Sequence, residues 1–340
     1  MRTKIVVAAV LCIAAILLGV AIGSVNIPIT DVISIVRYNT FGRSLPEHIT
    51  PGRVAIVWSN RLPRTLLAFI AGATLSVSGA VMQSVLRNPL ASSYTLGVSS
   101  GASFGASLVI FLGVSLPFMP MLTLPMLGFA FGLATILIVI GIARQMDARM
   151  DNHTIILTGM VFSLFINAIT TMLFALFREG TQRMVFWQMG SFSMRGSWNT
   201  VYILAPVALA GIFFITRFKW ELDIMTFGEE QAQTIGVDTG KVKLILLITA
   251  AALTGSTIAF VGIIGFVDLV APHVVRKIFG SAHRYVIPMS AAVGGTFMVL
   301  ADIIARTLTS PVELPVGAVT ALIGAPFFAY VFFSKRRRLA

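Results

Sequence analysis

Few residues in this sequence could do chemistry, and the first candidate is a serine between two glycines. Residues 97–101 read Gly-Val-Ser-Ser-Gly, which fits the GxSxG pattern that holds a nucleophilic serine on a strand-to-helix turn in hydrolases. Here the motif opens an apolar helix with no strand before it, and no convincing His and acid partners stand nearby. Close helix packing explains Ser99 better than ester hydrolysis does, so no catalytic residue is predicted.

A second candidate is the segment 236–241, Gly-Val-Asp-Thr-Gly-Lys, which is similar to a phosphate-binding loop. A P-loop has four residues between its glycines and places Ser or Thr after the lysine to coordinate magnesium. This segment has three residues between the glycines, and Val242 follows Lys241. The sequence therefore predicts that any ATP used by this protein is hydrolysed by another polypeptide.

Metal-ligating and ionisable side chains are also sparse. The only cysteine, Cys12, lies in an apolar run, and the four histidines form no ligand spacing such as HExxH. No metal site and no cofactor are predicted. An ionisable group at membrane depth is costly and often functional, so the carboxylates near apolar segments either couple transport to an ion gradient or lie at helix ends. These carboxylates are Asp268, Asp302 and Glu313.

The elements that position these residues are predicted to be membrane-spanning helices. Of the 340 residues, 57% are hydrophobic and 11% are charged, against about 25% charged in a soluble domain. Apolar segments of about 20 residues, the length that crosses a bilayer core, recur along the chain, and no basic stripe typical of nucleic-acid binding is present. We predict one all-α membrane domain over residues 1–340. Its ten spans lie near residues 4–23, 62–86, 94–114, 119–142, 153–177, 198–216, 242–260, 262–278, 285–308 and 314–334.

Ten spans place both termini on one side, and Lys and Arg concentrate in cytoplasmic connections. The side that holds the termini carries 16 of the 25 Lys and Arg residues, including all the lysines, so both termini are predicted to be cytoplasmic. Residues 66–83 and 244–261 share a composition rich in Ala, Ser, Thr and Gly, which either an inverted repeat or biased composition would produce. GxxxG pairs are predicted to pack helices closely. The three pairs are Gly19/Gly23, Gly101/Gly105 and Gly128/Gly132.

One cytoplasmic connection, residues 225–243, is too polar to span a membrane. Thr226 and Glu229 fit a capping box, and Gly236 offers a C-terminal stop, which predicts a short helix over about 227–235. Phe227 and Ile235 would give this helix an apolar contact for a partner. The alternative is a helix that lies idle at the membrane surface.

The arginines predicted on the outer side include a group at the mouths of two spans. Arg61 and Arg64 lie at the start of the second span, and Arg306 lies at the end of the ninth. Exposed guanidinium groups bind carboxylates in a bidentate manner, which favours docking of an acidic protein or ligand. Snorkelling of each arginine to the interface is the alternative.

These motifs together resemble the FecCD family of ABC importer permeases, whose members carry iron siderophores, haem or cobalamin. The resemblance covers nearly the whole chain, and its motifs stand in the family's order. Asp268 departs from the pattern, which has glycine there, and this leaves the substrate subgroup open. The matching segments are 61–64 (Arg-Leu-Pro-Arg), 87–91 (Arg-Asn-Pro-Leu-Ala), 96–102, 187–191, 228–237, 265–267, 272–276, 301–306, 313–317 (Glu-Leu-Pro-Val-Gly) and 324–328.

The resemblance implies the fold of an ABC type II importer permease in a bacterial cytoplasmic membrane. It implies a homodimer, or a heterodimer of homologous permeases, with a translocation path between them for a metal chelate, for which ferric siderophore is the first candidate. A substrate-binding protein would dock on Arg61, Arg64 and Arg306. A secondary transporter driven by an ion gradient is the alternative. Two ATP-binding subunits would bind a coupling helix at about 226–238, at the positions Thr226, Phe227, Gly228, Glu229, Ala232, Ile235 and Gly236.

Overall fold

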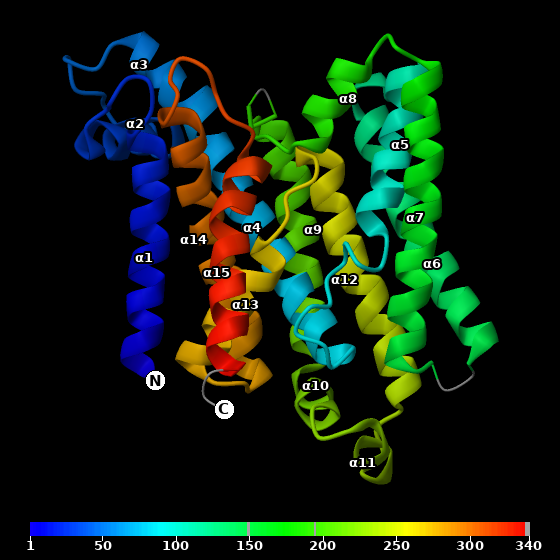
Figure 1. Cartoon of the computed structure of the whole chain (residues 1–340). Helices are drawn as coiled ribbons and strands as arrows, with labels where there is room; N and C mark the ends of the chain where they lie inside the picture. Colours follow the sequence, from blue (N-terminus) through cyan, green and yellow to red (C-terminus); the bar gives the residue numbers. More distant parts are fainter. Residues whose placement is uncertain (148–149, 194, 337–340) are drawn as a thin grey trace.

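In the part of the chain that the structure describes, ten longer helices form the body of the protein (Figure 1). The computed structural model describes residues 1–147, 150–193 and 195–336, and the regular secondary structure in these ranges is all helical. The ten helices follow the ten predicted spans in order, which confirms the predicted membrane fold. Their bounds are α1 (Arg2–Ala21), α4 (Leu62–Val85), α5 (Val98–Leu112), α6 (Thr123–Met146), α7 (Asn152–Leu176), α9 (Trp198–Thr216), α12 (Thr239–Val261), α13 (Val267–Phe279), α14 (His283–Thr307) and α15 (Val316–Arg336).

Shorter helices cover the two ends of this body. The start of α1, the end of α15 and the connection from α9 to α12 lie at the lower end in Figure 1. This arrangement agrees with an even number of membrane crossings, and the lower end is the one predicted to be cytoplasmic. The short helices are α2 (Ile29–Phe41), α3 (Pro51–Ala55), the π-helical η1 (Ile56–Arg61), the 3₁₀-helical η2 (Pro120–Leu122), α8 (Thr181–Gln188), α10 (Lys219–Met225) and α11 (Glu229–Thr234).

Residues 22–61 form a small lobe at the upper end, which the sequence analysis did not predict (Figure 1). Apolar side chains of α2 and η1, among them Ile35 and Val57, are fully buried against the end of α1. Asp31 is buried in the lobe, where its carboxylate lies 3.1 Å from Arg53 and 3.1 Å from His48. The lobe is therefore a packed unit and not a loose loop.

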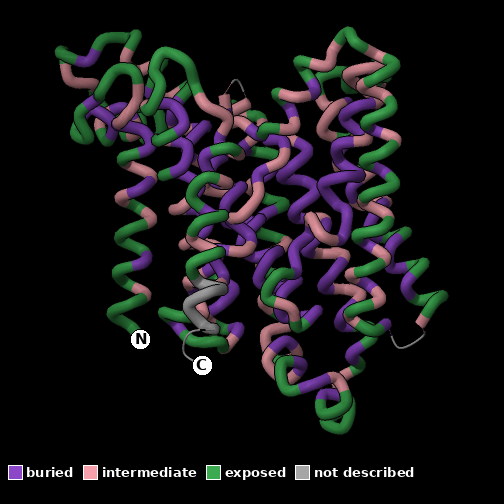
Figure 2. Tube along the Cα trace, in the orientation of Figure 1, coloured by how far each residue is buried: buried purple, intermediate pink, exposed green. Residues whose placement is uncertain are grey.

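α4 and α12 occupy the centre of the bundle, where Figure 2 shows mostly buried residues. Residues 71–85 of α4 are all buried, and the two helices pack against each other in opposite directions. The hydroxyls of Thr74 and Thr257 meet at 2.7 Å in this interface. Small side chains permit such close packing, which accounts for the shared composition of segments 66–83 and 244–261. The inverted repeat itself stays a prediction.

Two of the predicted glycine pairs lie where α5 crosses α6. A Cβ atom on Gly101 or Gly105 would collide with backbone carbonyls of α6. In α6, Gly132 faces the same crossing, whereas Gly128 lies nearest to Ala259 of α12. The prediction of close packing is therefore confirmed for these pairs. It is wrong for Gly23, because α1 ends at Ala21 and Gly23 lies beyond the helix against the guanidinium group of Arg61.

The eighth span is only partly helical. Residues 262–266 form no helix, and α13 has 13 residues, which span about 20 Å against a bilayer core of about 30 Å. Backbone groups of such a segment need protein partners within a membrane. Ser191 donates its N–H to the carbonyl of Val261 (2.9 Å), and the hydroxyl of Tyr94 donates to the carbonyl of Ile264. The predicted helix over 262–278 is thus corrected to begin at Val267.

Candidate functional site

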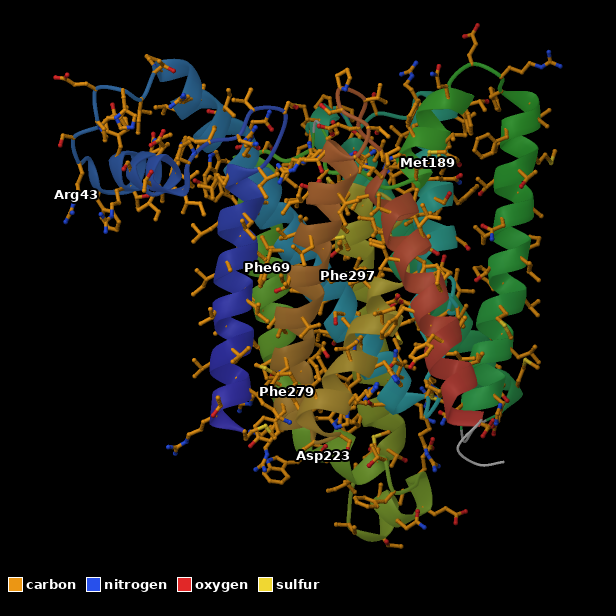
Figure 3. All side chains as sticks on the ribbon, turned by 60° about the vertical axis from the view of Figure 1, so that its left-hand side comes forward. Arg43, Phe69, Met189, Asp223, Phe279 and Phe297 are labelled. Carbon is orange, nitrogen blue, oxygen red and sulfur yellow. The ribbon has the colours of Figure 1, made fainter. Side chains whose placement is uncertain are left out.

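The connection from α9 to α12 projects beyond the lower end of the bundle as α10 and α11, and Figure 3 places Asp223 of α10 there. The predicted capping box is wrong. The hydroxyl of Thr226 donates to the carbonyl of Asp223 (2.7 Å) and closes α10 instead. Gly228, with a φ of +132°, then turns the chain so that α11 begins at Glu229. The helix is consequently shorter than the predicted 227–235.

The predicted stop at Gly236 is confirmed. Gly236 has a φ of +94°, a conformation that glycine adopts at little cost, and the N–H of Val237 donates to the carbonyl of Ala232 (3.0 Å). This bond closes the helix as in a Schellman motif. Ala232 itself is fully buried in the apolar core below α4 and α12. One face of α11 is therefore fixed to the bundle.

Two large apolar side chains flank α11 on its outer side. Phe227 is 77% exposed and Ile235 is 68% exposed. The rest of the segment around them is held in place, because Ala232 is buried and the helix is closed at its C-terminal end. Apolar groups presented on a fixed support favour contact with a second protein. These side chains are accessible to a second protein, and the docking role of the helix stays a prediction.

Glu229 has an internal partner that the sequence analysis missed. Its Oε1 lies 2.7 Å from Nζ of Lys243, which is fully buried at the start of α12. Lys243 also donates to the carbonyl of Met150 (2.8 Å) and to Oδ1 of Asn152 (2.9 Å). These three bonds use every hydrogen of the ammonium group. Glu229 therefore ties α11 to α12 and to the connection between α6 and α7.

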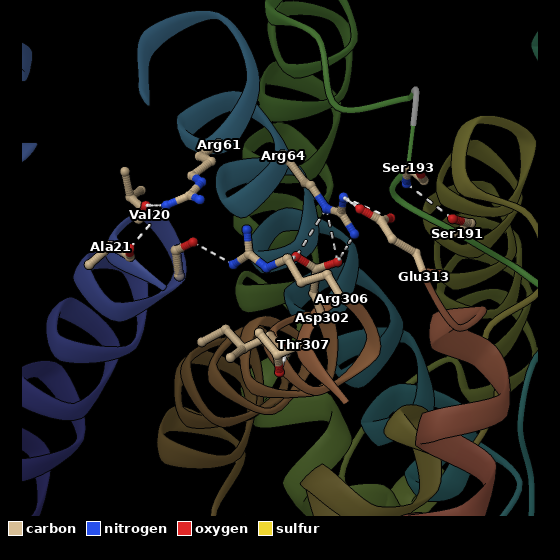
Figure 4. Close-up of polar contacts among 12 residues, drawn as sticks. Val20, Ala21, Arg61, Arg64, Ser191, Ser193, Asp302, Arg306, Thr307 and Glu313 are labelled. Carbon is tan, nitrogen blue, oxygen red and sulfur yellow. Dashed lines mark hydrogen bonds and ion pairs between the residues drawn. The ribbon is translucent and has the colours of Figure 1, made fainter. Parts of the chain in front are cut away.

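At the opposite end, the three arginines predicted to be exposed are buried (Figure 4). Arg64 donates to both oxygens of Asp302, the shortest contact being 2.8 Å, and to both oxygens of Glu313 at 2.9 and 3.0 Å. Arg306 donates to the carbonyl of Gly19 and lies 3.6 Å from Asp302. The premise of exposure is wrong, and the arginines join helices that are distant in the sequence.

Arg61 completes this arrangement at the end of α1. It donates to the carbonyls of Val20 (3.2 Å) and Ala21 (3.0 Å) and to that of Val25. These carbonyls belong to the last turn of α1 and the loop after it, where helical hydrogen bonding leaves acceptors free. The three arginines therefore hold the upper ends of α1, α4 and α14 together. Their contact with a docking protein stays a prediction.

Glu313 lies in the loop before α15 and is the most accessible carboxylate of this cluster. Burial raises the pKa of Glu313, but the hydrogen bonds and the charge of Arg64 outweigh burial and hold that pKa below its ordinary value. A carboxylate with a lowered pKa in the folded state contributes stability above its unfolded pKa and loses it as pH falls through the folded value. The Arg64–Glu313 pair is therefore intact at neutral pH.

Three glycine-containing motifs meet beside the non-helical part of the eighth span. The backbone at Gly190 approaches the carbonyl of Ile263 so closely that a Cβ atom would not fit, and Gly262 lies in the same way against the carbonyl of Trp187. Gly317, at the start of α15, contacts the carbonyls of Met189 and Ile263. Residues scattered over the sequence thus gather around a short stretch of irregular backbone, a feature that many transporters use near their transport path.

Comparison with known proteins decides the family of this fold. A model described as the FecCD transport family matches residues 11–334. The chain belongs to this family. Among FecCD relatives, the ABC transporter permease YvrB of Bacillus subtilis is 42% identical and the match covers 95% of this chain and 91% of YvrB. The cobalamin import permease BtuC of Halobacterium salinarum is 38% identical, with coverages of 83% and 74%.

A solved structure agrees with the FecCD assignment. It is described as a metal-chelate type ABC transporter in an inward-facing conformation, and it matches with a TM-score of 0.85 at 28% identity over 98% of this chain and 100% of that chain. The resemblance inferred from the sequence motifs is thereby confirmed. Other FecCD relatives are named for Fe(3+)-citrate, hemin and molybdate, so membership alone does not define one cargo.

Proposed function

We propose that this chain is the membrane-spanning permease subunit of an ABC importer that carries a metal chelate into the cell. The observation that carries the proposal is α11, a short helix outside the bundle with exposed Phe227 and Ile235 and a buried attachment to α12. Family membership supports it. We place the protein in a bacterial cytoplasmic membrane with both termini in the cytoplasm.

The proposed assembly contains two copies of this chain, or this chain and a homologous permease, with the transport path between them. Two ATP-binding subunits bind the segment from Thr226 to Asp238, and a substrate-binding protein delivers the cargo at the opposite end near Arg61, Arg64 and Arg306. ATP binding brings the two ATPases together, which moves α11 and changes the side to which the path opens. Ferric siderophore is the first candidate cargo, followed by haem and cobalamin.

The test is ATPase docking, and the structure shows which residues to change. Replacing both Phe227 and Ile235 by serine removes exposed apolar groups without opening the core, and we expect the affinity for the ATPase to fall about tenfold or more. Glu229→Arg is less suitable, because it would take away the only carboxylate that the structure places against buried Lys243 within the described residues and would put a second positive charge beside it. Co-purification of the ATPase and cargo-stimulated ATP hydrolysis in liposomes are the measurements.

Phe41→Ser is the matched control, since Phe41 is 75% exposed at the end of α2, at the other end of the molecule. The control should bind the ATPase as the wild type does. Supplying ferric siderophore, haem and cobalamin in turn, each with its binding protein, identifies the cargo by the one that stimulates hydrolysis. If the wild type binds no ATPase, or if the double variant binds it with unchanged affinity, the proposed docking site is wrong.

The alternative, an ion-driven secondary transporter, needs a buried carboxylate that is free to exchange a proton or cation. Asp302 does not meet this need, because both its oxygens accept from Arg64. Asp268, in the first turn of α13, is buried, and within the described residues its Oδ2 has no hydrogen-bond partner. We expect Asp268→Asn, which keeps the shape of the side chain, to retain ATP-driven uptake. Loss of uptake with intact ATPase binding would instead favour ion coupling.

A further inference from the structure

The segment of α10 and α11 is attached to the bundle at two separate points. At the first point, Oδ1 of Asp223 accepts the backbone N–H of His283 (2.8 Å) and lies 2.6 Å from Nδ1 of its ring. His283 begins α14 and is buried. On the other side of the ring, Nε2 lies 2.7 Å from the hydroxyl oxygen of Ser84, which is in the last turn of α4.

Further hydrogen bonds link Ser84 of α4 to α13. Arg276 of α13 donates to the hydroxyl of Ser84 (3.1 Å) and to the carbonyl of Ala80 (3.1 Å), and it also binds the side-chain oxygen of Gln83. The amide nitrogen of Gln83 then donates to the carbonyl of Asp268 (3.1 Å). Polar contacts therefore run without interruption from α10 to the first turn of α13, beside the non-helical part of the eighth span.

The second attachment is the pair of Glu229 and Lys243 described above. It leads to a different set of helices, because Lys243 lies near the start of α12 and its other two bonds go to Met150, before α7, and to Asn152, the first residue of α7. Figure 1 shows α1, α13, α14 and α15 on one side of the central helices α4 and α12, and α5, α6 and α7 on the other side. The first attachment thus leads to α14, α4 and α13, and the second leads to α12 and the α6–α7 connection.

We propose that Asp223 and His283 are positioning residues that transmit displacement of α11 to α4 and α13, while Glu229 and Lys243 transmit it to α12 and the α6–α7 connection. This inference rests on the proposed function, because it takes the ATPase to be the source of the displacement. Buried hydrogen-bonding groups that separate leave donors and acceptors unpaired at high cost. The hydrogen-bonded side chains that link Asp223 to Asp268 therefore move together, and they displace the irregular backbone at the start of α13.

Replacement of Asp223 tests the first attachment, with the number of cargo molecules imported per ATP hydrolysed as the readout. Asp223→Ala removes the acceptor of both His283 bonds, and we expect this ratio to fall about fivefold or more, with ATPase binding and basal hydrolysis maintained. Asp223→Asn keeps an oxygen at the same place and should restore the ratio. A residue that served stability alone would lower the amount of folded transporter and leave the ratio unchanged.

Asp31→Ala is the matched control, because it removes a carboxylate that also contacts a histidine, His48, at the far end of the molecule. It should leave the ratio as in the wild type. If Asp223→Ala proves too unstable to purify, Ser84→Ala interrupts the same series of hydrogen bonds between His283 and Arg276 and should lower the ratio in the same way. In the double variant Asp223→Ala/Ser84→Ala the losses should not add, since both substitutions break one series of hydrogen bonds.

An unchanged ratio in Asp223→Ala, or in Ser84→Ala when only that variant can be measured, overturns the inference while leaving the importer assignment in place. The same conclusion follows if Asp223→Asn loses as much as Asp223→Ala, because then an oxygen acceptor is not what matters. Absence of any ATPase on the wild-type permease is a different result. It rejects the proposed function itself, on which the inference depends.

Discussion

Asp302→Ala is expected to lower the free energy of unfolding by about 3 to 5 kcal/mol, the cost of breaking a buried ion pair from one side. The substitution leaves Arg64 without its shortest ion-pair contact and removes the carboxylate next to Arg306. Both guanidinium groups are buried, so water does not replace the lost partner. The loss exceeds that of a surface pair because an uncompensated charge remains inside the protein.

The measurement is the midpoint of unfolding by heat or SDS for the permease in lipid nanodiscs. Glu313→Gln is the control, because the side chain of Glu313 is 35% exposed and pairs of this kind contribute about 1 kcal/mol or less. Similar losses from the two substitutions would contradict the assignment of Asp302 as the principal partner of Arg64.

A double variant separates this structural role from docking. Arg64→Met combined with Asp302→Leu removes both charges and fills the space with apolar groups, an exchange that is often neutral for buried pairs. We expect it to regain part of the stability lost in Asp302→Ala, because it removes the buried charge of Arg64 while Arg306 still lacks its carboxylate. If the arginines also contact the substrate-binding protein, the double variant will fold and still bind that protein less tightly. Unchanged binding would reject Arg64 as a docking residue.

Gly72→Val is expected to cost about 3 kcal/mol, at the upper end of what overpacking a close-packed interior usually costs. Gly72 of α4 lies against α14, where a Cβ atom would collide with the carbonyl oxygen of Gly294 and would approach the Cβ of Met298. Backbone atoms on the other side of the contact leave no flexible side chain to move away. The two helices would have to separate along their whole interface.

Gly141→Val is the control for this substitution, because Gly141 lies in α6 and a Cβ placed there would have no atom of another helix within 4 Å. The same residue change should shift the unfolding midpoint much less in α6 than in α4. Gly72→Ala should fall between the two. Equal shifts for Gly72→Val and Gly141→Val would show that helix propensity, and not the contact of α4 with α14, causes the loss.

Most of the helical architecture could be predicted from the sequence, and the reason is local. A membrane span is defined by the hydrophobicity of about 20 consecutive residues, so the ten helices follow the ten predicted segments. The position of the short helix before α12 was also predicted, because Gly236 ends it through its own backbone conformation. Where the span is irregular, as at residues 262–266, hydrophobicity gave no sign that the helix begins only at Val267.

The partners of the polar side chains could not be predicted, because they depend on how distant helices meet. Arg64 and Asp302 are 238 residues apart, and Asp223 and His283 are 60 apart. The sequence showed charged residues near predicted spans, and from their positions we expected exposed arginines. From the spacing of Thr226 and Glu229 we expected a capping role for Thr226. Only the tertiary structure decided that the arginines are buried and that Glu229 binds Lys243, since burial and pairing arise when the helices pack.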